Sequence, residues 1–222
     1  MNESVNCFDE TITPSKNEIS RESQNLPKNS FVFSSFHRNE FITLNQFKIW
    51  CNILHRVENS VLWLLRINDI SVQNLLYQAE KLGISKERII FADHIPLEDH
   101  LNRTTLSDLT LDTFPSNGGP TSLISLFMGV PVVTMYGESY SARIGYDILK
   151  NIGLNDLVAA SENEYENLAV MYALDKEWRS KIKNKLILQK KNSILFNSQH
   201  FATSLENLLE NLIYNLHLKN SN

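Results

Sequence analysis

The chain has 222 residues, of which 42% are hydrophobic and 21% are charged, and its formal net charge is −4. This size and balance are typical of a folded domain with a substantial core. The acidic balance argues against nucleic-acid binding. No apolar run approaches the length of a membrane span, and the polar, acidic start differs from a signal peptide. The two cysteines predict no disulfide framework, so we expect a cytoplasmic protein that does not bind membranes.

Residues 1–29 are rich in Asn, Ser, Glu and Thr and contain few large apolar side chains. Such a segment buries too little apolar surface to offset the entropy that ordering costs. The sequence therefore predicts a disordered polar N-terminal tail over residues 1–29.

From residue 30 onward, strand-like and helical patterns alternate. Apolar runs predict strands at 31–36, 60–67, 88–95, 108–114, 131–136 and 156–160. Helical spacing of apolar residues predicts helices at 44–56, 71–82, 97–106, 121–128, 140–152 and 162–174. This alternation predicts an α/β fold, a Rossmann-like parallel sheet of about six strands with flanking helices. Because the strands are almost continuously apolar, we expect both faces of the sheet to be covered.

Two further helices are expected after the sheet, the first over a basic segment at about 177–191. The last helix, at about 199–218, carries Phe201, Leu205, Leu208, Leu212 and Leu216 on one face. We expect this face to pack on the lobe, and an interface for a partner protein is the alternative. The expected organisation is therefore a tail at 1–29, a lobe at 30–198 and a C-terminal amphipathic helix at 199–218.

The turns after the fourth and fifth predicted strands are suited to holding phosphate. The first turn reads Asn-Gly-Gly-Pro-Thr-Ser over residues 117–122, and the second runs from Gly137 to Arg143. Glycines let the backbone approach a ligand closely, and a helix N-terminus offers free N–H groups and a positive dipole end. The alternative is an ordinary turn with a helix cap, which any strand-to-helix junction needs.

Ligands of open parallel sheets bind beyond the carboxyl ends of the strands. The candidate site therefore gathers the segments 37–38, 94–100, 117–122 and 137–143, whose glycines, hydroxyls, histidines and arginines suit a nucleotide diphosphate. The histidines lack metal-ligand spacing, so we predict no metal. The chain also lacks a Gly-x-Ser-x-Gly elbow and a Gly-x-x-x-x-Gly-Lys loop, and we predict no cofactor.

An ordered series of short segments covers most of the chain from residue 30 to residue 216. The segments read FHR at 36–38, WCNIL at 50–54, NSVLWLLR at 59–66, RIIF at 88–91, EDH at 98–100, LDTFP at 111–115, NGG at 117–119, GVPVVT at 129–134, GE at 137–138 and SAR at 141–143. Together they resemble the C-terminal catalytic lobe of the protein O-linked N-acetylglucosamine transferases, glycosyltransferase family 41. The resemblance implies a GT-B architecture of two Rossmann-like lobes, with a UDP-sugar held mainly by the C-terminal one. It also implies transfer of N-acetylglucosamine, or of another hexose, to protein Ser or Thr.

The resemblance assigns a set of UDP-sugar-binding residues. They are Arg38, His100, Arg103, Asn117, Gly118, Gly119, Thr121, Ser122 and Arg143. His100 and Arg103 match the family segment beside the uracil ring, where an imidazole stacks on a base and a guanidinium adds hydrogen bonds or a cation–π contact. The members at 117–122 match the family's phosphate loop, and Asp112 is expected to brace that loop. For Arg143, a phosphate contact and an ion pair with Glu138 or Asp147 are both open.

Three positions depart from the family pattern around the expected donor. Phe41 stands where the family carries a lysine on the donor phosphates, and its phenyl ring cannot neutralise charge. Arg38 is expected to substitute in part, although the two cations differ in geometry. Ile124 replaces an acidic residue that reaches the ribose, and Pro120 replaces a common threonine. These changes predict weakened or altered donor binding.

The resemblance also implies partners outside this chain. They are UDP-N-acetylglucosamine or another UDP-hexose, an acceptor protein, and a separate N-terminal lobe or tetratricopeptide-repeat chain. The family's acceptor-side histidine lies in that other lobe, so no catalytic residue is assigned here. We expect a glycosyltransferase donor-binding lobe, and the alternative is a truncated or degenerate non-catalytic module that binds UDP-sugar or proteins. A UDP-sugar epimerase of similar fold fits these segments less well.

Overall fold

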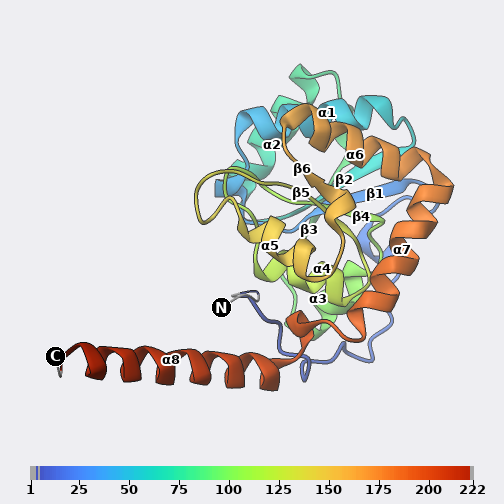
Figure 1. Ribbon diagram of the computed structural model, residues 1–222. Helices are drawn as coiled ribbons and strands as arrows, with labels where there is room; N and C mark the ends of the chain where they lie inside the picture. Colours follow the sequence, from blue (N-terminus) through green and yellow to red (C-terminus); the bar gives the residue numbers. More distant parts are fainter. Residues whose placement is uncertain (1–3, 5, 221–222) are drawn as a thin grey trace.

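A computed structural model describes residue 4 and residues 6–220, with side chains up to residue 215. In this part of the chain, six parallel strands form one sheet in the spatial order β3-β2-β1-β4-β5-β6 (Figure 1). The strands are β1 (Phe31–Ser35), β2 (Ser60–Leu65), β3 (Ile89–Ala92), β4 (Leu109–Leu111), β5 (Val132–Met135) and β6 (Val158–Ala159). Their pairings are all parallel, which confirms the predicted α/β fold.

Helices cover both faces of this sheet, as the apolar strands predict. The helices are α1 (Leu44–Arg56), α2 (Asp69–Lys81), α3 (Leu97–Thr104), α4 (Pro120–Phe127), α5 (Ile144–Asn151), α6 (Glu162–Leu174), α7 (Lys176–Lys190) and α8 (Ser198–Asn220). Short 3-10 turns lie at η1 (Glu22–Gln24), η2 (Asn39–Phe41), η3 (Lys86–Arg88), η4 (Asn155–Leu157) and η5 (Ile194–Phe196). Helices α1, α2 and α6 lie on one face and α3, α4 and α5 on the other (Figure 1). All six residues of β2 are buried between the two layers.

The helix boundaries follow from local capping. The hydroxyl of Thr43 accepts a hydrogen bond from the main-chain N–H of Gln46 at the start of α1, and Ser161 caps α6 in the same way. Gly83, just past α2, has a φ of 77°, a left-handed conformation that glycine adopts without a side-chain clash. The predicted helix at 140–152 begins later, at Ile144, because residues 138–143 form a turn.

The strand order creates the crevice where a ligand of such a sheet binds. The chain leaves β1 toward β2 in one direction, and it enters β4 on the other side of β1. At this switch point the connections after β1 and β4 diverge to opposite faces, which leaves an opening beyond their carboxyl ends. The loops after β1, β4 and β5 therefore meet at one edge of the sheet.

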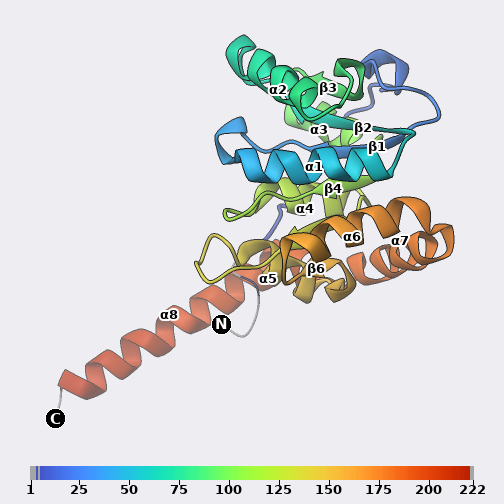
Figure 2. The same ribbon diagram turned by 90° about the horizontal axis from the view of Figure 1, so that it is seen from above.

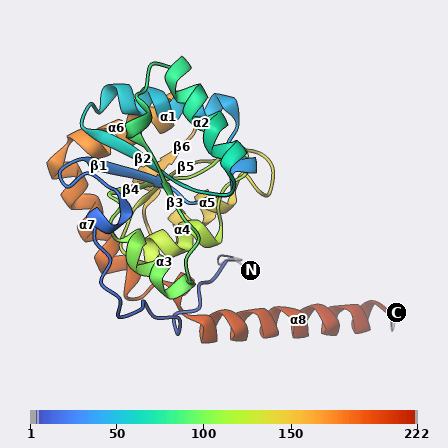
Figure 3. The ribbon, with the colours of Figure 1, turned by 180° about the vertical axis from the view of Figure 1, so that it is seen from behind.

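The N-terminal segment packs along the lobe, so the expectation of a disordered tail is wrong for residues 4 and 6–29. Phe8 is 8% exposed, and its ring centroid lies 4.6 Å from that of Phe127 in α4. Leu26 is also buried, and the guanidinium of Arg21 lies 2.9 Å from the carboxylate of Asp108. Figure 3 shows this segment passing α3 and α4 before it enters β1. The lobe supplies apolar and charged partners for a few spaced side chains, and local composition does not contain that information.

The last helix is present, but its predicted packing on the lobe is wrong for the described side chains. Helix α8 leaves the lobe and projects away from it (Figures 1 and 2). Of the predicted face, Leu205 and Leu212 are 38% and 51% exposed, and Phe201 and Leu208 are half-buried. Near its start, the N–H of Ser198 donates to the carboxylate of Glu10. Leu216, which the sequence places on the same apolar face, lies outside the described side chains. Helical spacing shows that an apolar face exists, but it does not show what covers that face.

Candidate functional site

The site lies at the carboxyl edge of β1, β4 and β5. After β4, residues 112–122 form a loop that runs into the first turn of α4, and we call it the phosphate loop. Its central residues Asn117, Gly118 and Gly119 are all buried, with Asn117 7% exposed. The amino termini of α4 and α5 meet here, because the N–H of Gly145 in α5 donates to the side-chain oxygen of Asn117. Helix N-termini carry a partial positive charge, so this arrangement favours an anion.

The buried carboxylate of Asp112, the first residue of the phosphate loop, binds main-chain N–H groups of the same loop. Asp112 is completely buried, and its Oδ1 accepts hydrogen bonds from the main-chain N–H groups of Thr113 (2.9 Å) and Gly118 (2.7 Å). Its Oδ2 accepts from the hydroxyl of Thr134 on β5 at 2.6 Å. Burial raises the pKa of Asp112 to about 7, and these hydrogen bonds oppose the rise. Asp112 therefore braces the loop, as expected from the sequence.

His37 lies in segment 37–38 of the candidate site, but the sequence assigns it no binding role. It follows β1 and is 4% exposed, with Nδ1 2.9 Å from the hydroxyl of Thr121 and Nε2 3.4 Å from Oδ1 of Asp112. Burial lowers its pKa to about 4, so the ring is neutral at pH 7. Nothing in the sequence shows that this imidazole turns inward. Thr121 and Asp112 lie more than 70 residues away in the chain.

The two glycines of the loop differ in the room around them. A Cβ placed on Gly118 would lie 1.7 Å from Cε1 of His37, so the imidazole occupies the space over this glycine. A Cβ on Gly119 would meet Asn6 Oδ1 at 3.4 Å and Ile144 at 3.6 Å, which are ordinary contacts or nearly so. Of these two positions, only position 118 therefore requires a glycine, because a larger side chain there would overlap His37. The contact at Gly119 also places Asn6 of the N-terminal segment beside the start of α4.

The polar side chains of the loop are engaged inside the protein to different degrees. The amide of Asn117 donates to the carbonyls of Thr113 (2.8 Å) and Met135 (3.1 Å), so it joins the β4 and β5 connections. The hydroxyl of Thr121 contacts His37. Ser122 is 1% exposed, and its hydroxyl has no hydrogen-bond partner in the described chain. The Asn117 side chain thus holds the shape of the loop and the Thr121 hydroxyl is held by His37, whereas the Ser122 hydroxyl is not engaged by the described residues.

The two predicted arginines lie at the rim. Arg38 is exposed, and its guanidinium carbon lies 5.4 Å from the centroid of the Phe41 ring. The Nε of Arg143 donates to the carbonyl of Gly137 at 3.1 Å. Among the described residues, no ion pair joins Arg143 to Glu138 or Asp147. Arg143 instead borders a cavity of about 550 Å³ whose other lining residues are Tyr136, Gly137, Glu138 and Tyr146.

His100 and Arg103 form a second cluster on α3. The Nε of Arg103 donates to Nδ1 of His100 at 2.9 Å, which leaves the proton of the neutral imidazole on Nε2. Burial and the neighbouring guanidinium lower the pKa of His100 to about 4. Arg103 is 2% exposed and donates to the carbonyl of Asp93 at 2.5 Å. Burial lowers its pKa to about 10, so it stays charged at pH 7.

The end of β1 connects the two clusters. The Phe36 ring meets His100 edge-on at a centroid distance of 5.1 Å, while the next side chain, His37, contacts Thr121. Phe36 and His37 directly follow β1, and these two adjacent side chains contact the two different clusters. Beside α3 lies a cavity of about 210 Å³, lined by Phe36, Leu65, His94, Ile95, Leu97, His100 and Arg103. A ligand with a flat aromatic group could place that group in this cavity and extend an anionic group toward the N-terminus of α4.

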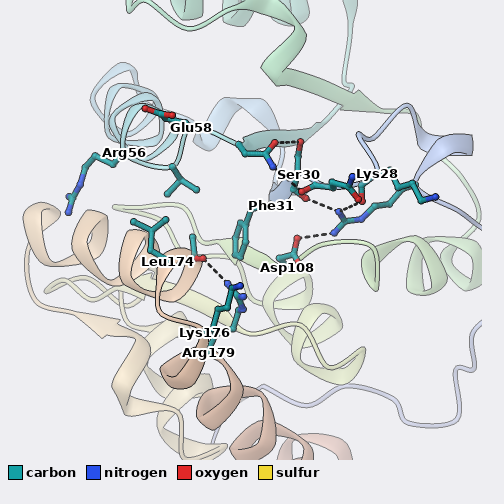
Figure 4. A pocket seen from close by; sticks show the side chains of 14 residues that line it. Lys28, Ser30, Phe31, Arg56, Glu58, Asp108, Leu174, Lys176 and Arg179 are labelled. Carbon is teal, nitrogen blue, oxygen red and sulfur yellow. Dashed lines mark hydrogen bonds and ion pairs between the residues drawn. The ribbon is translucent and has the colours of Figure 1, made fainter.

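A larger cavity, about 790 Å³, lies at the opposite edge of the sheet, where β1 and β2 begin (Figure 4). Several of its cationic side chains already have partners inside the protein. Arg21 pairs with Asp108, and Arg179 donates to the carbonyl of Ala173 at 2.7 Å and so caps the end of α6. Parallel sheets bind ligands at their carboxyl edge. We therefore place the functional site at the phosphate loop.

Comparison with protein families and curated proteins points to one group. The model of Glycosyl transferase family 41 matches residues 6–205. The UDP-N-acetylglucosamine--peptide N-acetylglucosaminyltransferase of Caenorhabditis elegans is 31% identical over 190 residues, which cover 86% of this chain and 16% of that protein. The probable UDP-N-acetylglucosamine--peptide N-acetylglucosaminyltransferase SPINDLY of Arabidopsis thaliana is 36% identical over 193 residues, covering 83% and 21%. The chain thus spans about a fifth of the length of these relatives.

Solved structures share the fold. A mutant of the Thermobaculum terrenum O-GlcNAc transferase superposes with a TM-score of 0.77 at 25% identity, covering 89% of this chain and 38% of that one. Anabaena Alr3699/HepE, solved in complex with UDP and glucose, superposes with a TM-score of 0.66 at 18% identity, covering 92% and 55%. The second likeness concerns the fold alone.

Proposed function

Because this chain belongs to glycosyl transferase family 41, we propose that it is the donor-binding lobe of a glycosyltransferase that moves N-acetylglucosamine, or another hexose, from UDP to protein Ser or Thr. One observation carries the proposal. Phe36 and His37, just after β1, join an aromatic and cationic cluster on α3 to the N-terminus of α4 at the switch point of the sheet. A nucleoside diphosphate has a flat base and an anionic group that match these two clusters.

The roles follow from the contacts. The neutral ring of His100, with its proton on Nε2, presents a face and one donor to uracil, and Arg103 fixes that ring. The diphosphate lies at the amino termini of α4 and α5, where the main chain from Gly119 to Ser122 and the rim cations Arg38 and Arg143 face it. These dipoles and charges stabilise the UDP that leaves during transfer, and they need little reorganisation. We propose that no metal ion takes part.

The acceptor side of the reaction belongs to partners. In the family the acceptor-side histidine lies in the N-terminal lobe, so we propose that a second lobe and an acceptor protein complete the site. We also propose a cytoplasmic location, and the free thiols of Cys7 and Cys51 agree with a reducing compartment.

A second function is favoured by specific contacts. The N–H of Gly118 and the hydroxyl of Thr121 already have partners in Asp112 and His37, and Ile124 is buried at 8% exposure. These contacts leave fewer polar groups free to bind a UDP-sugar, as expected of a module that has kept the fold but lost its catalytic activity. Such a module would bind UDP-sugar weakly or bind proteins alone.

Calorimetric titration of the folded chain with UDP and UDP-N-acetylglucosamine, in EDTA and again in Mg²⁺, tests the proposal. We expect saturable binding in both buffers and at least a tenfold loss in His100→Ala. The matched control is His55→Ala, because His55 is exposed near the far end of α1. Absence of binding at millimolar ligand would favour the protein-interaction module. Binding that His100→Ala leaves unchanged would contradict the assigned base site.

A further inference from the structure

Both ring nitrogens of His37 face polar groups of the phosphate loop. Nε2 lies 3.4 Å from Oδ1 of Asp112, and the hydroxyl oxygen of Thr121 lies 2.9 Å from Nδ1 and 3.4 Å from Nε2. Both His37 and Asp112 are buried, at 4% and 0% exposure. The imidazole is therefore enclosed between a carboxylate under the loop and a hydroxyl in the first turn of α4.

Few hydrogens are available for the hydrogen bonds among His37, Asp112 and Thr121. Oδ1 of Asp112 accepts two main-chain hydrogen bonds and so acts as an acceptor, and the single N–H of the neutral imidazole belongs on Nε2, toward this oxygen. Nδ1 is then an acceptor, and the hydroxyl of Thr121 donates to it. A hydroxyl carries one hydrogen, so Thr121 has none left for a ligand.

An anion at the start of α4 changes this arrangement. If a proton from solvent adds to Nδ1, the ring becomes a cation that donates to Asp112 through Nε2 and to Thr121 through Nδ1. The hydroxyl hydrogen of Thr121 then turns to an oxygen of the anion. One proton enters, no covalent bond to carbon changes, and the bound negative charge stabilises the imidazolium.

We propose that His37 is a positioning residue that couples binding of the donor diphosphate to the uptake of one proton, through the hydroxyl of Thr121. The inference rests on the proposed function, because it assumes a diphosphate at α4. Of the described groups that face the ring, Asp112 at the end of β4 is the titratable one. The α4 side contributes Gly118 and Thr121, and the neighbouring Arg38 is exposed beside Phe41.

Burial supports the direction of the coupling. The pKa of His37 is lowered to about 4 in the free protein, so the ring is neutral across pH 6 to 8. A diphosphate brings negative charge within reach of Thr121, and opposite charge raises the pKa of an imidazole. Uptake of a proton on binding means that affinity rises as pH falls.

The test is calorimetric titration with UDP-N-acetylglucosamine in pairs of buffers with different ionisation enthalpies, between pH 6 and 8. Both phosphates of this ligand are esterified, so its own protonation does not change in this range. We expect uptake of about one proton and an affinity that falls up to tenfold for each pH unit. His37→Gln and Thr121→Val should each bind without proton uptake. His55→Gln is the matched control and should retain it.

The outcomes separate this inference from the proposed function. Tight binding by the unaltered chain with no buffer dependence would overturn the coupling and leave donor binding intact. Failure of the folded chain to bind would overturn both. If His37→Gln does not fold, nitrogen NMR of the imidazoles in the unaltered chain replaces it. The His37 pKa should then rise from about 4 to above 7 when inorganic pyrophosphate is added, and a pKa that stays below 6 would overturn the coupling.

Discussion

The hydroxyl of Tyr165 donates a 2.8 Å hydrogen bond to the main-chain carbonyl of Asp112, and so ties α6 to the start of the phosphate loop. The same hydroxyl accepts a hydrogen bond from the indole N–H of Trp50 in α1, at 3.2 Å. The side chain of Gln46 also donates to this carbonyl, at 2.9 Å. Helices α1 and α6, which lie far apart in the sequence, therefore both hold Asp112, the first residue of the phosphate loop, in place.

Replacing Tyr165 by Phe should destabilise the protein by about 1–2 kcal/mol. The change leaves the N–H of Trp50 buried without its acceptor, while the carbonyl of Asp112 keeps Gln46. Chemical denaturation measures the loss. The same change at Tyr77, which is 53% exposed, should alter stability by less than about 0.5 kcal/mol. Equal losses at both positions would argue against the role of Tyr165 under the loop.

Gly118→Ala should reduce UDP affinity at least tenfold and destabilise the chain by about 2–4 kcal/mol. The new methyl would overlap the ring of His37, whose Cε1 lies 1.7 Å from the Cβ position. Gly119→Ala is the matched control and should cost less than about 1 kcal/mol, because its Cβ has room. Part of the stability should return when His37→Ala is combined with Gly118→Ala. No recovery in the double variant would mean that the clash lies elsewhere.

Phe8→Ala should destabilise the protein by about 3–4 kcal/mol, although Phe8 lies in a segment of polar composition. Its ring is 8% exposed and packs on Phe127, so its removal leaves a cavity between the N-terminal segment and α4. Thermal and chemical denaturation measure the effect. Phe41→Ala removes the same group from a site that is 38% exposed, and it should cost less than about 1 kcal/mol. A negligible loss at Phe8 would restore the interpretation of a loose tail.

Stability should fall as pH falls from about 6.5 to about 4, partly through His100. Its folded pKa is about 4 against an ordinary value of 6.5, so the unfolded chain binds more protons in this window. His37 acts in the same direction. Asp112, with its pKa raised to about 7, acts in the opposite direction, so His37 and Asp112 largely offset each other. His100→Gln should therefore lower the slope of unfolding free energy against pH by about one proton. An unchanged slope would contradict a buried neutral His100.

The order of elements and the carboxyl-edge site could be predicted because their signals are local. The apolar run at 60–67 predicts a strand with both faces covered, and all residues of β2 are buried. Gly83 marks the end of α2 because a positive φ favours glycine there. The bracing role of Asp112 was also predictable, since a polar side chain directly after a strand and before a turn finds main-chain N–H groups nearby.

The inward position of His37 and the docking of Phe8 could not be predicted in the same way. His37 is buried because Asp112, Gly118 and Thr121 meet it after the sheet has formed. Phe8 is buried because α4 presents Phe127 to it. The apolar face of α8 shows the converse, since its spacing predicts burial, but Leu205 and Leu212 on that face stay 38% and 51% exposed because the helix projects away from the lobe.

By itself, therefore, the sequence determined the alternation of strands and helices, the parallel sheet and the turns that hold the candidate site. These features arise from residues within a few positions of each other, where spacing and backbone preference decide the outcome. Only the tertiary structure decided that His37 enters the loop, that the N-terminal segment packs on the lobe and that α8 leaves it. Each of these depends on whether surfaces distant in the chain complement one another, and that is decided only when the chain folds.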